Sequence, residues 1–208
     1  ADELKDDFLS IASHQMRTPI STILGYTSIL NSGDAGAMNK EQEKFAKVVE
    51  SSTKRLAYLI NDFLTVSRLK SGKFAIEKGP TDLKAALKEE VNDLEHQFEV
   101  KKIKLNVHID SHIPQMNADE QKLRQVMMNL MDNALHYTPD GGKVDVLMKL
   151  DGHQLAFEVR DTGIGVPKAQ QSELFSKMFR AGNAQKMRPD GTGLGLYLAK
   201  KVVLGHHG

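Results

Sequence analysis

The sequence contains no cysteine, which excludes disulfides, thiolate zinc sites and a thiol nucleophile and fits a reducing compartment. Basic and acidic residues nearly balance, at 28 and 27, so there is no basic surplus of the kind that binds nucleic acid or an anionic membrane. No apolar run approaches the roughly 18 residues of a membrane span. The HExxH motif of a zinc site does not occur. We therefore expect no nucleic-acid partner and no span within this chain.

The first 70 residues have apolar positions at the three- and four-residue steps typical of long helices. We expect one helix from Asp2 to about Asn31, a small polar loop at 31–39 and a second helix from about Lys40 to Lys70. The second helix approaches a coiled-coil seam, with apolar positions at Phe45, Val48, Val49, Leu56, Leu59, Ile60, Phe63, Leu64, Val66 and Leu69. An antiparallel hairpin buries only one face of each helix, so we predict a homodimer paired as a four-helix bundle.

The remainder of the chain alternates between helical and extended patterns, which predicts a sheet covered by helices. Helices are expected at about 82–100 and 119–137 and from about 194 onward, and strands at 104–109, 143–150 and 155–161. A loop rich in Gly, Lys and Arg precedes the last helix. The fold class is therefore α+β, with a long antiparallel helical hairpin at 1–72 followed by an α/β sandwich domain at 73–208.

The helix at 119–137 carries two asparagines on one stripe, Asn129 and Asn133, and Tyr137 continues that stripe at the next four-residue step. Asparagine is a mediocre helix former, so two of them inside a core-like helix need partners. Amide oxygens can ligate a hard cation such as Mg²⁺, which also bridges nucleotide phosphates. Two solvent-facing amides with Tyr137 packed beside them remain the alternative.

The motif DTGIG, at 161–165, follows the last expected strand. The carboxylate of Asp161 can accept a hydrogen bond from the amino group of adenine and would meet the carbonyl of guanine unfavourably. Gly163 and Gly165 let the backbone approach a planar ring closely. Taken alone, the motif fits an ordinary Asp-Gly turn at least as well.

A second glycine motif lies directly before the last helix, in DGTGLGLYLAKK at 190–201. Its glycines leave backbone N–H groups free to hold phosphate. The pattern matches neither GxGxxG nor GxxxxGK, so neither a Rossmann site nor a P-loop is indicated. Four basic residues between the two glycine motifs either reach a phosphate tail or form a solvated loop: Lys177, Arg180, Lys186 and Arg188.

The stretch SHQMRTP, at 13–19, places a histidine one turn before a proline inside the first helix. Pro19 lacks an N–H and crowds the carbonyl of Gln15, so we expect the helix to bend just after His14. His14 and Thr18 share a face, and a neutral imidazole offers one lone-pair nitrogen as a nucleophile. An isolated helical histidine is usually only a surface residue.

In order, these motifs resemble those of the sensor histidine kinases. The H-box is matched by FLSIASHQMRTPISTILGYTSIL, the N-box by NLMDNALHYTP, the first glycine box by DTGIG, the F-box by LFSKMFR and the second glycine box by GTGLG. The resemblance runs from about Asp7 to residue 208, and five short motifs in this order are a specific signature.

The resemblance implies a dimerising hairpin followed by an ATP-binding domain of the kind shared with Hsp90 and DNA gyrase. On this basis His14 is the phosphoacceptor, Arg180 meets the transferring phosphate, residues 172–189 form a lid over ATP, and Asn129 and Asn133 serve Mg²⁺. The nucleotide-binding set would be Asn129, Asn133, His136, Tyr137, Asp161, Gly163, Gly165, Gly191, Thr192, Gly193, Leu194 and Gly195.

The function implied is autophosphorylation of His14 with ATP and Mg²⁺, followed by transfer to an aspartate on the receiver domain of a response regulator. Relatives that also dephosphorylate this partner have a Thr or Asn where this chain has Thr18. The expected location is the cytoplasm, which also suits the cytosolic part of a membrane-anchored receptor whose membrane segments lie outside this chain.

Three departures from the family pattern stand out. Gln15 occupies the place of a Glu or Asp that accepts the second imidazole proton, and His136 occupies the place of a Lys that contacts phosphate. The family also adds two strands after the point where this sequence stops, so either the sheet is short or those strands lie outside the sequence given.

Two alternatives remain at the level of sequence. In one, Gln15 silences phosphorylation and leaves a nucleotide-binding dimeric signalling module with mainly phosphatase function through Thr18. In the other, the chain is an ATPase of the Hsp90 or gyrase type. Those enzymes place a glutamate base where this chain has Asn129, and they lack the H-box.

The substitution Gln15→Glu is predicted to raise the initial rate of His14 phosphorylation by Mg²⁺-ATP. A glutamine carbonyl can fix the imidazole tautomer but cannot take its proton, and positioned general-base help is typically worth about 10²–10⁴-fold, which bounds the gain. Phosphoryl transfer depends mostly on positioning and charge stabilisation, so the native Gln15 slows the reaction rather than abolishing it. An unchanged or lower rate in the variant would contradict this reasoning.

Overall fold

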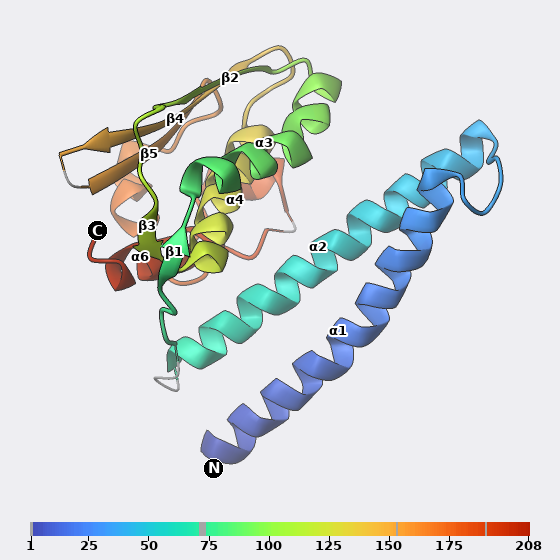
Figure 1. Cartoon of the computed structure of the whole chain (residues 1–208), viewed down its shortest axis with the longest axis horizontal. Helices are drawn as coiled ribbons and strands as arrows, with labels where there is room; N and C mark the ends of the chain where they lie inside the picture. The colour runs from blue at the N-terminus through green and yellow to red at the C-terminus, as the bar shows by residue number, and fades with distance from the viewer. Residues whose placement is uncertain (1, 71–73, 153, 190) are drawn as a thin grey trace. The chain divides into compact units, whose positions relative to one another are not determined.

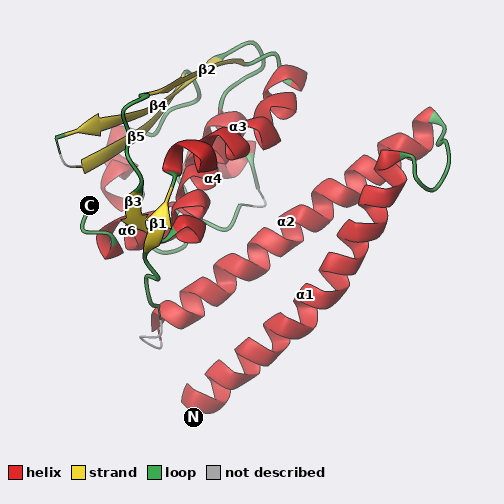
Figure 2. Cartoon of the chain, in the orientation of Figure 1, coloured by secondary structure: helices red, strands yellow, loops and turns green. Residues whose placement is uncertain are grey.

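The computed structural model describes residues 2–70, 74–152, 154–189 and 191–208 (Figures 1 and 2). The chain divides into two compact units, Ala1–Phe74 and Ala75–Gly208. Within the described part, no helix combines the length and the apolar character needed to cross a membrane.

The first unit is a hairpin of two long helices, α1 (Asp2–Ser32) and α2 (Lys40–Lys70), which run side by side from the connecting loop (Figure 1). A reciprocal capping box starts α2. The Asn39 side chain accepts hydrogen bonds from the amides of Glu41 and Gln42, while Gln42 Oε1 accepts one from the Asn39 amide at 2.9 Å. Both helices and the loop were predicted from the apolar spacing, and they are confirmed.

The two helices of the hairpin pack through a narrow seam of small and aliphatic side chains. The buried members described there are Ile20, Thr27, Ala46, Thr53 and Leu64. Outside this seam, large apolar side chains are exposed along both helices, namely Met16, Ile23, Tyr26, Ile29, Leu30, Phe45, Val48, Val49 and Leu56. The hairpin alone therefore leaves an apolar surface uncovered.

The second unit contains a three-stranded sheet in the order β2 (Lys104–Ile109), β4 (Lys143–Asp151) and β5 (Gln154–Asp161). Strand β2 pairs with β4 in parallel and β4 pairs with β5 antiparallel, which brings Asp161 opposite Val144. Alternate residues of β4 (Val144, Val146 and Met148) are fully buried, so this face of the sheet carries the core. All three strands were predicted.

Helices α3 (Leu83–Val100) and α4 (Glu120–Tyr137) contact this sheet, and α6 (Gly195–Gly205) packs against α4. Helix α4 contacts α3, α6, β4 and β5, which makes it the central element of the unit. Its buried side chains (Val126, Met127, Met131, Ala134 and Leu135) lie on one side of the helix. The helices were predicted within one residue at their starts, because Asp82 and Asp119 are the N-caps.

Two expectations about connecting segments were incomplete. Residues 79–81 form strand β1 (Gly79–Thr81), which pairs antiparallel with an unpredicted strand, β3 (Met116–Ala118). The segment expected as loop before α6 contains a 3₁₀ helix, η1 (Lys168–Glu173), and a short helix, α5 (Gly182–Met187). Elements of three to six residues are too short to show an apolar period, so tertiary contacts decide them.

Both ends of α4 are held by charged side chains. At its start, the Asp119 carboxylate accepts hydrogen bonds from the Glu77 amide (2.9 Å), from the Lys122 amide (3.1 Å) and from Lys122 Nζ (2.6 Å). The Asp119 amide donates to His206 Nε2 at 3.0 Å, which ties the end of α6 to the same point. At its other end, Lys101 Nζ donates to the carbonyls of Leu135 (2.7 Å) and Thr138 (2.8 Å).

The substitution Asp119→Ala is predicted to reduce the stability of the second unit by about 2 kcal/mol, because it removes an N-cap and leaves the Glu77 amide unpaired. Burial opposes ionisation of Asp119, but the hydrogen bonds from Lys122 and Glu77 outweigh it and hold its pKa below the ordinary 3.8. This stabilisation is therefore present above pH 3.8 and is lost as the pH falls through the lower pKa of the folded state.

Hydrogen exchange at the amides of α4 in the full chain measures this effect. Asp93→Ala is the matched control, because Asp93 is exposed on α3 and its removal should change exchange little. Equal protection of α4 in the Asp119→Ala variant and the native chain at neutral pH would contradict the assignment.

Candidate functional site

The motif around His14 lies within α1, which continues through Pro19. Pro19 cannot donate to the Gln15 carbonyl, and one turn later Thr22 Oγ1 donates to the Thr18 carbonyl at 3.0 Å. The side chains of Gln15 and Thr18 are exposed, whereas the side chain of His14 lies outside the described residues. The sequence segment thus forms a continuous helix that presents Gln15 and Thr18 to solvent.

The second unit brings together α4 and the start of α6. Asn129, partly buried on α4, donates from Nδ2 to the Gly195 carbonyl at 3.3 Å, where Gly195 is the first residue of α6. Asn133 and Tyr137 follow at four-residue steps and are also partly buried. Asn129, the first residue of the predicted polar stripe, therefore meets the second glycine box.

The first glycine box packs against the end of α4. Asp161 ends β5 with an exposed side chain, and its carboxylate accepts a hydrogen bond from the Gly163 amide at 2.8 Å. A Cβ on Gly163 would lie 2.5 Å from the Tyr137 carbonyl oxygen, and the Ile164 amide donates to that oxygen at 3.1 Å. The glycine at 163 is needed for the approach to α4, a reason that the sequence did not reveal.

The second glycine box packs against the F-box. Gly193 has φ +69°, and a Cβ there would lie 2.7 Å from the carbonyl carbon of Met178 and 2.8 Å from the Phe179 carbonyl oxygen. Leu194 is buried and immediately precedes α6, and its amide donates to Thr192 Oγ1 at 3.3 Å. These contacts fix the residues that immediately precede α6 against the F-box.

Arg180 contacts backbone carbonyls of its own segment. Its guanidinium donates to the carbonyls of Pro189 (2.9 Å), Ala184 (3.3 Å) and Arg188, all within its own segment. A Cβ on Gly191 would lie 3.0 Å from the same group. Arg180 therefore holds residues 184, 188 and 189 together, and meeting a phosphate requires it to leave these carbonyls.

Of the other basic residues in this segment, Arg188 reaches α4. Its Nη1 lies 2.8 Å from Oδ2 of Asp132, and the Arg188 side chain is 20% exposed. Lys177 is partly buried and Lys186 is exposed at the end of α5.

Asp132 was missed by the sequence analysis, although it lies three residues after Asn129 on the same side of α4. It also contacts His136, whose Nδ1 lies 3.1 Å from Asp132 Oδ1 and 2.8 Å from the Asp132 carbonyl oxygen. Burial raises the pKa of Asp132, but the hydrogen bond and charge of His136 and the charge of Arg188 outweigh it and lower that pKa. Asp132 is therefore a carboxylate that holds two predicted phosphate contacts at once.

Asn183 is a second residue without a recognisable sequence signal. Its Nδ2, from α5, donates to the Gly165 carbonyl at 2.8 Å and the Ile164 carbonyl at 3.4 Å. It joins the segment between the two glycine boxes to the first of them. A single asparagine in a polar loop gives no pattern from which this contact could have been inferred.

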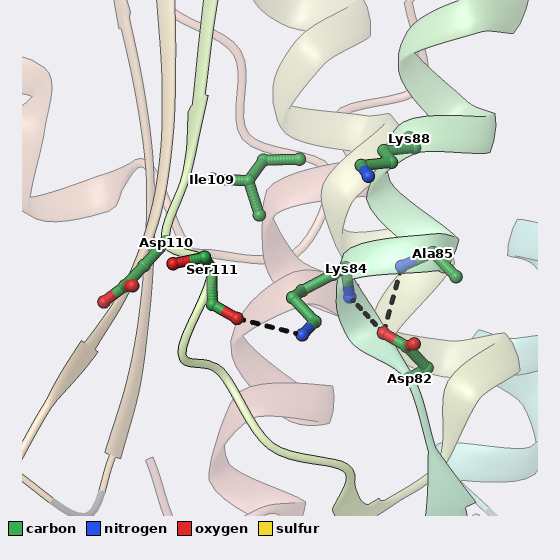
Figure 3. Close-up of a pocket in the computed structure, with 7 residues that line it drawn as sticks. All are labelled: Asp82, Lys84, Ala85, Lys88, Ile109, Asp110 and Ser111. Carbon is green, nitrogen blue, oxygen red and sulfur yellow. Dashed lines mark hydrogen bonds between the residues drawn. The ribbon is translucent and has the colours of Figure 1, made fainter.

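A cavity of about 500 Å³ lies elsewhere, between the start of α3 and the end of β2 (Figure 3). Asp82 turns back to cap the amides of Lys84 and Ala85, and Lys84 Nζ donates to the Ser111 carbonyl at 3.2 Å. The remaining lining residues are Lys88, Ile109 and Asp110. These seven residues share none with the predicted nucleotide site.

Two family models match the chain in succession. Residues 4–72 match the His Kinase A (phospho-acceptor) domain, and residues 118–208 match the histidine kinase-, DNA gyrase B- and HSP90-like ATPase family. The chain is 32% identical to the circadian input-output histidine kinase CikA of Synechococcus elongatus over 210 residues, which cover all of this chain and 28% of CikA. It is 33% identical to the signal transduction histidine-protein kinase BarA of Escherichia coli, and the match covers 98% of this chain and 22% of BarA.

Solved structures give the same result. Full-length ShkA in complex with AMPPNP is 29% identical with a TM-score of 0.65, covering 96% of this chain and 41% of ShkA. The histidine kinase AdeS of Acinetobacter baumannii, at 20% identity and a TM-score of 0.58, shows the fold over 92% of this chain and 86% of AdeS. The chain thus spans about a quarter of the length of CikA and BarA. With both domains present in this order, it belongs to the sensor histidine kinase family and carries the catalytic core.

Proposed function

We propose that the chain is an ATP-dependent protein-histidine kinase core that phosphorylates His14 and then passes the phosphoryl group to an aspartate of a response regulator. The observation that carries the proposal is the meeting of Asn129, on α4, with Gly195, at the start of α6, in a chain whose α1 bears His14. We place the boundary between the phosphoacceptor hairpin and the ATP-binding domain at residues 72 and 73, close to the division between the two compact units at Phe74 and Ala75.

In the proposed reaction a neutral His14 imidazole attacks the γ-phosphorus with its ring-nitrogen lone pair. A P–N bond forms while the bond to the β,γ-bridging oxygen breaks, and ADP leaves with that electron pair. The proton on the other ring nitrogen is shared with an acceptor. The side-chain amide oxygen of Gln15, an exposed residue on the same helix, can fill this role. In the second reaction an aspartate oxygen of the partner replaces nitrogen on phosphorus.

The donor chemistry of α4 suits Mg²⁺. Because Asn129 donates its Nδ2 to the Gly195 carbonyl, its amide oxygen is left as an acceptor of the kind that Mg²⁺ prefers. Asn129 and Asn133 would hold the ion, which when bound neutralises phosphate charge. Asp161, exposed at the end of β5, would accept the adenine amino group, and the amides of residues 191–195 would hold phosphate.

We also propose that the core is a homodimer through its hairpin. The apolar side chains outside the hairpin seam include Tyr26 at 68% and Phe45 at 58% exposure. A soluble monomer rarely leaves such a surface open, and a second hairpin would cover it as a four-helix bundle.

Mass spectrometry after incubation with Mg²⁺-ATP tests the kinase proposal, and an acid-labile phosphate on His14 is expected. His14→Gln should abolish it. His96→Gln should retain it, because His96 is an exposed histidine on α3 with 79% of its side chain accessible. ATP binding with a bare His14 would refute the kinase direction and leave the silenced module, whose phosphatase action through Thr18 would then be assayed on a phosphorylated partner.

The substitution Gly163→Ala is predicted to weaken AMPPNP binding by about tenfold or more. A Cβ 2.5 Å from the Tyr137 carbonyl oxygen and 2.6 Å from Asp161 Oδ1 must push the first glycine box away from α4, and overpacking of this kind typically costs about 1–3 kcal/mol. Titration calorimetry measures the affinity, with circular dichroism as a check on folding. Gly182→Ala is the matched control, because a Cβ there meets nothing within 4 Å. Unchanged affinity in a folded Gly163→Ala variant would be inconsistent with this geometry.

A further inference from the structure

The ion pair between Asp132 and Arg188 joins two elements of the proposed nucleotide site. Asp132 lies on α4 between Asn129 and Asn133, whereas Arg188 follows α5 and precedes the second glycine box. The Nη1–Oδ2 distance of 2.8 Å, with only 20% of the Arg188 side chain exposed, makes this a well-formed and largely shielded contact.

Arg188 is nevertheless only partly satisfied by this contact. Its Nε is buried and has no hydrogen-bond partner in the described part of the chain. A buried donor without an acceptor costs free energy. The pairing with Asp132 therefore leaves one donor of the Arg188 guanidinium, its Nε–H, unsatisfied. A planar guanidinium matches two oxygens of one acceptor group, and phosphate provides such a set.

The backbone around Arg188 is fixed independently of this ion pair. Arg180 donates to the carbonyls of Ala184, Arg188 and Pro189, and these hydrogen bonds hold the backbone before and after the Arg188 side chain. The Arg188 side chain can therefore change its acceptor without unfolding the segment that carries it.

Two charged or titratable groups face Asp132 directly. Arg188 approaches Oδ2, and His136 approaches Oδ1 from one turn further along α4. The ion pair with Arg188 holds Asp132 as a negatively charged carboxylate. Its negative charge lies on the same side of α4 as Asn129 and Asn133, where phosphates would be bound.

We propose that Asp132 is a latch for Arg188: it pairs with the guanidinium in the nucleotide-free protein and yields it to nucleotide phosphate on binding. The inference rests on the proposed function, because it needs ATP at this site. Asp132 thereby competes with the phosphates for one cation and sets the affinity for nucleotide. Asp132 is a positioning residue, since it acts through Arg188.

The test compares Mg²⁺-AMPPNP with adenosine in titration calorimetry on the full chain. Asp132→Asn keeps the shape and an acceptor oxygen for His136 but weakens the hold on Arg188. It should tighten AMPPNP binding about three- to tenfold and leave adenosine binding unchanged, because adenosine offers no phosphate. Weaker AMPPNP binding, or an equal gain for adenosine, would overturn the latch.

The background Arg188→Gln separates the latch from simple charge removal. If Asp132 acts through Arg188, Asp132→Asn has no further effect in the Arg188→Gln background. If Asp132 merely repels phosphate, the gain persists there, and the latch is refuted. Asp151→Asn removes one exposed carboxylate at the turn between β4 and β5 and should leave both affinities unchanged.

The outcome also distinguishes this inference from the proposed function. Native protein that neither binds AMPPNP nor labels His14 would remove the proposed function and the latch with it. Native protein that binds AMPPNP and labels His14, combined with an Asp132→Asn variant of equal affinity, would remove the latch alone.

Discussion

The second unit depends on helix α4 being buried on one side and polar on the other. Its apolar side, with Met127 and Met131 nearly inaccessible, holds the helix against α3 and the sheet. This leaves Asn129, Asp132 and His136 on a side that meets α6 and the segment before it. A shift of α4 that changed the packing of its apolar side would also displace the polar side chains on its other side, because cores are close-packed and tolerate little displacement. The same packing thus provides stability and positions the proposed site.

The long elements of this fold could be predicted because their apolar periods are unambiguous. Both helices of the hairpin, the three strands of the main sheet and helices α3, α4 and α6 follow from spacing and from N-cap residues such as Asp82 and Asp119. The small sheet of β1 and β3 could not be predicted, because it pairs residues that are far apart in the sequence, such as Thr81 and Met116. The same holds for α5, whose six residues are held by contacts from Asn183 to the first glycine box.

The site could be predicted in its motifs but not in its contacts. The order of the boxes predicts Asn129, Asp161 and the segment 191–195 as site residues, since residue type and spacing carry that signal. The roles of Gly163 and Gly193 depend on backbones that approach within van der Waals contact from distant parts of the chain. The contacts of Arg180 with carbonyls of its own segment could not be predicted either. A cation in a glycine-rich loop does not reveal its acceptor from sequence.

The charged caps of α4 have an electrostatic consequence. Asp119 places a negative charge at the positive end of the helix macrodipole, and Lys101 places a positive charge at its negative end. The field along the middle of α4 is therefore largely compensated, and phosphates beside Asn129 and Asn133 would gain little from the helix itself. Helix α6 differs, because its first turn has no side-chain cap and its N-terminal partial charge remains uncompensated. Of the two helices that meet at Asn129 and Gly195, only α6 keeps an axial field that attracts an anion.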